Sequence, residues 1–264
     1  QAVYLQSLGG QGPVIHRQTH AVYSLMDRLR RAHPGLEIES CASGGARADF
    51  GILRYTDRVW TSDNNDALDR QRIQRGASYF FPHDVLGSHV GPKRCHITGR
   101  MFDMEFRAAT AILGHMGMEL DLSEETDADL DVLRRAIALY KTHRELIHSG
   151  DFYRLEASDY LNMVGVVAKD QSAAIFSCAK VEGHSATLPG RIRFAGLSPD
   201  KHYQTRLIWP TRPPSVTAPS IVEAADLCGD GTVFRGAALV HFGIQLPLMH
   251  PNSCLLYHLK SVES

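Results

Sequence analysis

A run of polar side chains, Ser62-Asp63-Asn64-Asn65-Asp66, follows a short apolar segment and precedes a helical pattern. A carboxyl group at the end of a strand lies where α/β folds place their chemistry, and Asp63 is the strongest single candidate for a functional residue. The alternative is helix capping, because Asp, Asn and Ser all bond free amide groups at a helix start. A cap uses one such residue and this run has five, so both interpretations of Asp63 stay open.

A second cluster, Cys41-Ala42-Ser43-Gly44-Gly45, follows an earlier apolar segment. Paired glycines let the backbone approach a ligand closely or adopt a positive φ, although a plain tight turn uses the same residues. No Lys-Ser or Lys-Thr follows, which argues against a phosphate-binding loop. A cysteine nucleophile needs a positioned base, and the sequence near Cys41 holds no histidine, so it gives that role little support.

Three further residues flank these clusters. Arg47 and Asp49 are suited to orient a carboxylate or hydroxyl groups, and the alternative is a surface ion pair that contributes little. Trp60 could form a stacking platform for a sugar, but a Trp on a strand more often lies in the core.

Residues of metal-binding types also lie close together, at His83, His89, Cys95 and His96. A metal-dependent hydrolase built on them is a minor hypothesis, and we expect no metal and no cofactor.

The elements that carry these residues alternate between strands and helices. Strands are expected at residues 36–38, 58–61, 85–90 and 116–122, and helices between Pro13 and Pro34 and at residues 67–80, 101–115 and 123–150, the last capped by Ser123. This alternation is typical of an α/β barrel or an open α/β sheet, which place their chemistry at the carboxyl ends of the strands. Four such units are half of an eight-stranded barrel, and a half barrel has open sheet edges.

From about residue 151 the pattern changes to short β-branched and aromatic runs that turn residues separate, which predicts an antiparallel β-domain. Strands are expected at residues 161–167, 174–178, 191–194, 203–208, 238–242 and 254–259, with a long loop at 211–236. The sequence thus predicts an α/β part at residues 1–150 and an all-β sandwich-like domain at residues 151–264.

Bulk composition excludes several classes of protein. The net charge is −1, from 28 basic and 29 acidic residues, which argues against binding to nucleic acid or to an anionic membrane. The five cysteines are widely spaced without a C-x-x-C pair, which favours a reducing, cytoplasmic location. No bilayer-spanning run and no signal peptide are visible. The chain starts with Gln1, and we expect it to be part of a longer protein.

The segment CASGGARADFGILRYTDRVWTSDNNDALDR (residues 41–70) resembles the central signature of glycoside hydrolase family 36, the bacterial α-galactosidases. Its Cys-x-x-Gly-Gly-x-Arg-x-Asp and Ser-Asp-x-x-Asp-Ala-x-x-Arg parts stand at the family's separation, although Ala46 replaces a common glycine. The resemblance implies a (β/α)8 TIM barrel flanked by β-domains and retaining hydrolysis of terminal α-linked galactose. Asp63 matches the general acid/base. The residues that match the galactose site are Cys41, Ala42, Ser43 and Gly44, with Gly45, Arg47, Asp49 and Trp60 behind them.

The family's nucleophile is an aspartate in a Lys-Trp-Asp motif, and this chain contains no such motif. The resemblance therefore implies that the nucleophile lies upstream, in a part of the enzyme that also holds an N-terminal β-domain and the first half of the barrel. We expect the isolated chain to be inactive. The alternative is a non-catalytic carbohydrate-binding or structural remnant. Transglycosylation and homo-oligomer formation remain open.

Overall fold

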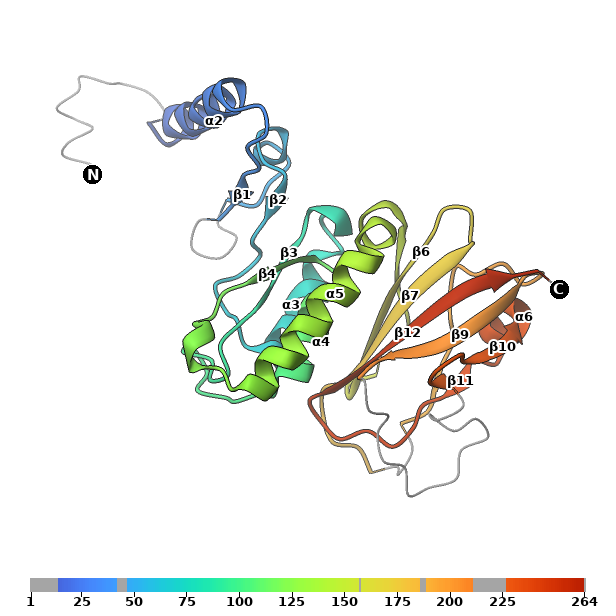
Figure 1. The fold of residues 1–264 in the computed structure, drawn as a ribbon. Coiled ribbons are helices and arrows are strands. Elements are labelled where there is room, and N and C mark those ends of the chain that lie inside the picture. The colour runs from blue at the N-terminus through green and yellow to red at the C-terminus, as the bar shows by residue number, and fades with distance from the viewer. Residues whose placement is uncertain (1–13, 42–46, 157, 186–188, 211–226, 264) are drawn as a thin grey trace.

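The computed structural model describes residues 14–41, 47–156, 158–185, 189–210 and 227–263. A parallel β/α part comes first and an antiparallel sheet follows it (Figure 1), which agrees with the predicted combination of α/β and all-β structure. Within these ranges, no helix is both long enough and apolar enough to cross a membrane.

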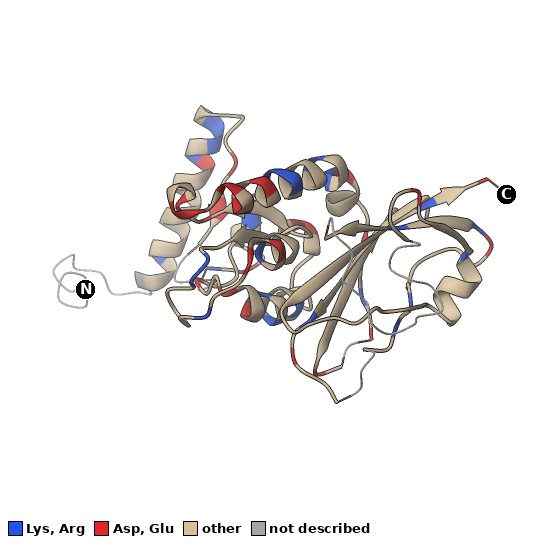
Figure 2. Cartoon of the chain, turned by 60° about the horizontal axis from the view of Figure 1, so that its bottom comes forward, with Lys and Arg blue, Asp and Glu red and all other residues tan. Residues whose placement is uncertain are grey.

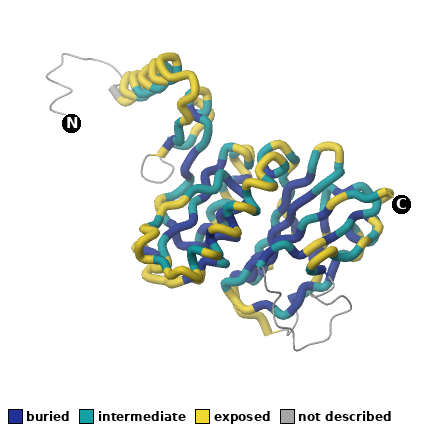
Figure 3. Tube along the Cα trace, viewed as in Figure 1, coloured by how far each residue is buried: buried dark blue, intermediate teal, exposed yellow. Residues whose placement is uncertain are grey.

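Helix α2 (Val14–Ala32) is the first described element and confirms the predicted helix. Tyr23 and Met26 pack against a small apolar cluster beside the first strands. Leu25 and Leu29 remain 55% and 40% exposed, and most of the helix is exposed in Figure 3. The apolar face of this helix, with Val22, Leu25, Met26 and Leu29 at helical spacing, is therefore only partly covered.

Four short parallel strands follow in chain order. They are β1 (Glu39–Ser40), β2 (Arg58–Val59), β3 (Gly87–Val90) and β4 (His115–Met118), with short 3-10 helices η1 (Ile52–Arg54) and η2 (His83–Val85) between them. β1 pairs with β2, β3 pairs with β4, and a parallel bridge from Val59 to Leu86 joins the two pairs. Their order in space therefore follows their order in the chain, and their carboxyl ends meet one edge of the sheet.

A helix follows each of the last three strands. These helices are α3 (Ala67–Ala77), α4 (Met104–Ala111) and α5 (Asp127–Ser149). Each starts at a side-chain cap, because Asp66, Asp103 and Thr126 accept hydrogen bonds from amides of the first turn.

The predicted cap of the last helix, Ser123, is wrong. Ser123 lies in the 3-10 helix η3 (Leu122–Glu124), and its amide donates to the Asp121 carboxylate at 2.9 Å. Thr126 caps α5 instead, by accepting from the amide of Asp129 at 3.2 Å. Several capping residues lie within four positions here, and propensity alone does not choose among them.

The second part is a six-stranded sheet in the order β10-β9-β12-β7-β6-β5, and every pair in it is antiparallel. Its strands are β5 (Asp151–Arg154), β6 (Leu161–Val167), β7 (Ala173–Lys180), β9 (His202–Trp209), β10 (Thr232–Arg235) and β12 (Ser253–Val262). A separate antiparallel pair joins β8 (Arg191–Ile192) to β11 (Ile244–Gln245).

Both faces of this sheet are buried. On one face, Val166, Ile175 and Leu256 share an apolar cluster with residues of α4 and α5. On the other face, Phe176 and Tyr257 pack with residues of β8, β11 and the neighbouring segments. Charged side chains accordingly gather on the helices and loops, and the strands of the sheet carry few of them (Figure 2).

Two predictions for the second part need correction. The expected strand at 238–242 is wrong, because residues Gly236–His241 form the short helix α6. Small and apolar residues in so short a run fit either structure. The expected loop at 211–236 is wrong at its end, where β10 pairs with β9, and residues 211–226 lie outside the described part.

Candidate active site

The two polar clusters that the sequence singles out start at the carboxyl ends of adjacent strands. The amide of Trp60 donates to the Ser40 carbonyl at 2.9 Å, which extends the β1–β2 pairing toward both clusters. Just beyond, the Cys41 thiol lies 3.7 Å from Oδ1 of Asp63. Both residues are exposed. The structure therefore brings together two predicted site residues that stand 22 positions apart in the sequence.

Asp66, not Asp63, caps helix α3. Its buried carboxylate accepts from the amides of Leu68 and Asp69 at 3.0 and 3.1 Å. It also accepts from Nε of Arg100 at 2.7 Å and from the Thr98 hydroxyl. The helix is thus capped by another residue of the same run, so Asp63 is not needed as a cap. Asp63 is exposed to solvent.

The turn that carries Asp63 is closed by its neighbours. The Asn64 amide donates to the Ser62 hydroxyl at 3.2 Å, and the Asn64 side chain accepts from the Asp66 amide at 3.0 Å. The Asn64 side-chain amide also donates to Asp69 at 2.8 Å. Three of the five polar residues therefore hold the turn or cap the helix, which explains why the run is longer than a cap requires.

Trp60 is 4% exposed and does not face solvent as a sugar platform. Its ring stacks on the His89 ring, with centroids 4.0 Å apart and planes 13° apart. The Arg70 guanidinium lies 4.0 Å from the centroid of the Trp60 ring. Trp60 therefore supports the strand from which Asp63 projects. Sequence reasoning did not single out Arg70 as a functional residue, although it closes the motif that carries Asp63.

Of the two remaining predicted residues that the structure describes, Arg47 and Asp49, the second has a local structural role. Its Oδ1 accepts from the Ile52 amide at 2.7 Å and from the Tyr23 hydroxyl at 3.2 Å. The Arg47 carbonyl accepts from the Ser40 hydroxyl at 3.1 Å. The predicted site residues Ala42, Ser43, Gly44 and Gly45 lie outside the described residues.

A chain of charged groups that the sequence did not reveal lies along the strands. Nδ1 of His89 lies 3.0 Å from Glu119 and Nε2 lies 3.5 Å from Glu39, and Arg58 pairs with Glu39 at 3.4 Å and with Glu37 at 2.8 Å. Burial opposes the charged imidazole, but the hydrogen bonds to Glu39 and Glu119 outweigh it and raise the pKa of His89. The hydrogen bond from His89 in turn lowers the pKa of Glu39.

The histidines considered for metal binding do not converge. His83 stacks on Phe152 at the amino end of β3, with centroids 4.1 Å apart, whereas His89 is held between two glutamates. Among the residues that the structure describes, no three His, Cys, Asp or Glu side chains are arranged to hold a metal ion.

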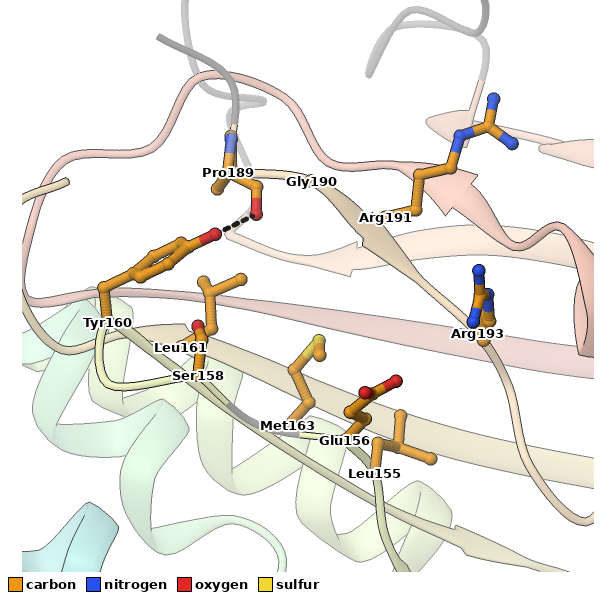
Figure 4. A pocket seen from close by; sticks show the side chains of 10 residues that line it. All are labelled: Leu155, Glu156, Ser158, Tyr160, Leu161, Met163, Pro189, Gly190, Arg191 and Arg193. Atoms are coloured by element: carbon orange, nitrogen blue, oxygen red, sulfur yellow. Dashed lines mark hydrogen bonds between the residues drawn. The ribbon is translucent and has the colours of Figure 1, made fainter. Parts of the chain in front are cut away.

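A cavity of about 440 Å³ lies in the second part of the chain, apart from these residues. One wall comes from residues 155–156 and 158–163 and the other from residues 189–193 (Figure 4). The Tyr160 hydroxyl closes one end by donating to the Pro189 carbonyl at 3.3 Å. Leu161 and Met163 contribute apolar surface, and the lining includes none of the predicted site residues.

Parallel strands followed by helices, with polar side chains at the carboxyl ends of the strands, define an α/β protein of the barrel or open-sheet type. The sequence model of the melibiase family matches residues 4–150, and the model of the glycosyl hydrolase family 36 C-terminal domain matches residues 162–259. The chain belongs to the melibiase family, within glycoside hydrolase family 36.

Curated relatives agree with this assignment. The α-galactosidase of Escherichia coli is 43% identical over 258 residues, which are 92% of this chain and 35% of that protein. The bifunctional α-galactosidase/sucrose kinase AgaSK of Mediterraneibacter gnavus is 34% identical over 230 residues, 86% of this chain and 22% of that protein. The chain thus spans about a third or less of the length of these two relatives.

Solved structures agree as well. A variant of the family 36 α-galactosidase AgaA from Geobacillus stearothermophilus, in complex with raffinose, superposes with a TM-score of 0.80 at 29% identity. The match covers 94% of this chain and 32% of that one. An α-galactosidase from Lactobacillus brevis gives a TM-score of 0.81 at 30% identity, with the same coverage.

Proposed function

We propose that this chain carries the acid/base half of a retaining α-galactosidase site, with Asp63 as the general acid/base. The observation that carries the proposal is the exposed Asp63 carboxyl at the end of β2, next to Cys41, while Asp66 performs the capping. Membership of the melibiase family supports hydrolysis of α-galactosides. Complexes of AgaA variants with raffinose and stachyose support oligosaccharide substrates.

The proposed mechanism needs two carboxyl groups, roughly 5–5.5 Å apart across the scissile bond. One carboxylate attacks the anomeric carbon, while Asp63 donates its proton to the departing glycosidic oxygen. Asp63 then takes a proton from the water that releases galactose with its configuration retained. Hydroxyl groups of the sugar would meet Cys41 and its neighbours 42–44.

We propose that the nucleophile comes from a segment outside this chain. The four parallel strands β1–β4 would then be the second half of an eight-stranded barrel, and β1 would pair with the missing half. The barrel part would end at residue 150, and residues 151–264 would form the C-terminal β-domain of sandwich type. On this proposal the isolated chain does not turn galactosides over.

One observation favours the alternative, a non-catalytic carbohydrate-binding role. The cavity in Figure 4 combines the aromatic ring of Tyr160 with charged side chains of Glu156 and Arg193, groups that suit the faces and hydroxyls of a sugar. Titration of the isolated chain with stachyose tests this role. Binding that Tyr160→Ala removes and Asp63→Asn preserves would favour the alternative.

Hydrolysis of a chromogenic α-galactoside tests the leading proposal. The isolated chain is compared with a version extended upstream through the Lys-Trp-Asp segment, the first half of the barrel and the N-terminal β-domain. We expect turnover only by the extended protein, and loss of that turnover in its Asp63→Asn variant. If the isolated chain is active, a carboxylate within it must be the nucleophile and the assignment of the site is wrong.

A further inference from the structure

The Arg70 side chain reaches from helix α3 back to the turn that carries Asp63. Its guanidinium donates to the carbonyls of Ser62 and Asn64, at 3.0 and 3.5 Å. These two residues flank Asp63 in the sequence. A further bond to the Thr61 hydroxyl, at 3.0 Å, holds the end of the strand that leads into the turn. The same planar group therefore fixes the backbone on both sides of Asp63.

Arg70 is costly to bury. The side chain is 1% exposed, and its hydrogen-bond acceptors among the described residues are neutral oxygens, the fourth being Oε1 of Gln74 at 2.6 Å. Its buried Nε finds no acceptor in the described part of the chain, and burial lowers the pKa of the guanidinium to about 10. A buried cation without a hydrogen-bonded carboxylate weakens folding, so stability alone gives little reason for an arginine here.

The surroundings of Arg70 hold the guanidinium in one orientation. It lies over the Trp60 ring at 4.0 Å. Gln74, which accepts one of its hydrogen bonds, also donates to the Gly87 carbonyl of β3 at 3.0 Å and accepts from the Thr61 hydroxyl at 3.1 Å. Thr61 follows β2 and Gln74 contacts β3, so the Arg70 guanidinium is held by the ends of both strands. Its N–H donors therefore keep one orientation toward the turn that carries Asp63.

We propose that Arg70 is a positioning residue for the acid/base, which fixes the backbone around Asp63 so that the carboxyl meets the glycosidic oxygen. This inference rests on the proposed function of Asp63. Arg70 would act through the turn and would not touch the substrate. A displacement of the reacting group by about 1 Å is enough to slow catalysis on the order of 100-fold.

Arg75 provides a matched control on the same helix. It too donates to backbone carbonyls, those of Met163 at 3.0 Å and Leu155 at 2.9 Å. These carbonyls belong to the second part of the chain, so Arg75 joins the two parts and makes no hydrogen bond to the turn of Asp63 among those described. Both arginines donate to backbone carbonyls, but of the two only Arg70 donates to those beside Asp63.

The test compares two substrates in the extended, active protein. A galactoside with a sugar leaving group needs a proton from the acid, whereas a dinitrophenyl α-galactoside does not, because dinitrophenolate is stable as an anion. In Arg70→Lys, which keeps the charge but not the planar fork, we expect kcat/KM for the sugar substrate to fall on the order of 100-fold. For the dinitrophenyl substrate we expect a fall of no more than about threefold, since acid catalysis contributes little there. Arg75→Lys should affect both substrates equally.

Asp63→Asn is measured beside these variants. A selective loss in Asp63→Asn together with an equal loss on both substrates in Arg70→Lys would overturn the inference alone. Absence of selectivity in Asp63→Asn would overturn the proposed function and the inference with it. If Arg70→Lys does not fold, Thr61→Val removes one acceptor of Arg70 and should give the same selectivity at smaller size. An unselective loss in Thr61→Val would then overturn the inference.

Discussion

The two parts of this chain bury their residues differently. The antiparallel sheet has an extensive core in which Phe176 and Tyr257 are almost fully buried. Among the residues that the structure describes, the cluster beside β1 and β2 has three buried members, Ile52, Val59 and Leu86. Large apolar side chains near this cluster, including Phe50 and Phe80, are 70% and 76% exposed. Figure 3 shows the same contrast between the sheet and the first elements.

The two parts therefore differ in what their side chains do: those of the sheet stabilise the chain, and those of the first strands fix positions near the proposed site. The sheet presents mostly apolar strands to its neighbours and gains its stability from the area that it removes from water. The first strands carry charged side chains such as Glu39, Arg58 and His89 and are held by ion pairs and caps. Directional interactions of this kind fix positions, which is what a proposed catalytic carboxyl requires.

The largest expected loss of stability comes from a substitution in the core of the sheet. Phe176→Ala should lower the free energy of unfolding by about 3–5 kcal/mol, because it leaves a cavity among buried neighbours. Phe50→Ala is the control and should change it by less than about 0.5 kcal/mol. Urea denaturation measures both. Equal effects at the two positions would remove the contrast between the two parts.

A smaller loss is expected at the cap beside Asp63. Asp66→Ala should cost about 2 kcal/mol, because two amides of α3 lose their acceptor and Arg100 loses its buried partner. Asp66→Asn keeps an acceptor for the amides and removes the charge that pairs with Arg100. Urea midpoints of both variants separate the two contributions. If Asp66→Ala left the urea midpoint unchanged, the turn would be held by other contacts.

Acid should lower the free energy of unfolding through two histidines that burial keeps uncharged, His83 and His148. Burial lowers the pKa values of His83 and His148 to about 4 each, whereas an unfolded histidine titrates near ~6.5. The unfolded state therefore takes up protons first, so this stability is complete above pH ~6.5 and is lost as the pH falls toward ~4. Melting temperatures between these pH values measure it, and His83→Gln should flatten the slope. An unchanged slope in that variant would contradict the assignment.

His89 should show the opposite sign. Its raised pKa means that its ion pairs stabilise the protein fully below pH ~6.5 and that this contribution is lost as the pH rises through the folded-state value. His89→Gln should therefore lower the melting temperature more at pH 6 than at pH 9. A variant that is equally destabilised at both pH values would show that stacking on Trp60, not charge, is the important contact.

The smallest effect is expected on α2. Asp27 and Arg31 form an ion pair in which the side chains are 38% and 78% exposed. Asp27→Asn should change the free energy of unfolding by less than about 0.5 kcal/mol, because water and salt screen such pairs. Urea denaturation at low and high salt measures this. A cost above 1 kcal/mol at low salt would contradict the view that α2 is weakly held.

The sequence predicts elements best where one pattern dominates. Strand β6 (Leu161–Val167) has the predicted bounds because a β-branched run lies between clear breaks. Prediction fails where residues fit two roles, as in the short helix α6 and at the cap of α5. It also cannot show that Asp66 and not Asp63 caps α3, because that choice depends on Arg100 and Thr98, which are more than 30 positions away.

The candidate site, like the fold, is predicted in part. The sequence selects Asp63 and Cys41 by type and position, and the structure shows that they are neighbours. The contacts of Arg70 and His89 become visible only in three dimensions. The partners of His89, Glu39 and Glu119, come from segments far away in the sequence, whereas Arg70 folds back onto the turn before its own helix. Periodicity and propensity indicate which element a residue belongs to, and not which atoms its side chain meets, so neither set of contacts could be predicted.

The most direct test of the central claim uses azide with the Asp63→Ala variant of the extended protein and a dinitrophenyl α-galactoside. Azide attacks the galactosyl-enzyme without a general base, so it replaces both water and the lost carboxyl in the second step. Because a retaining enzyme inverts the anomeric centre twice, the account predicts a faster reaction that yields galactosyl azide of α configuration. A β-configured azide would mean a single inversion, and it would show that Asp63 is the nucleophile.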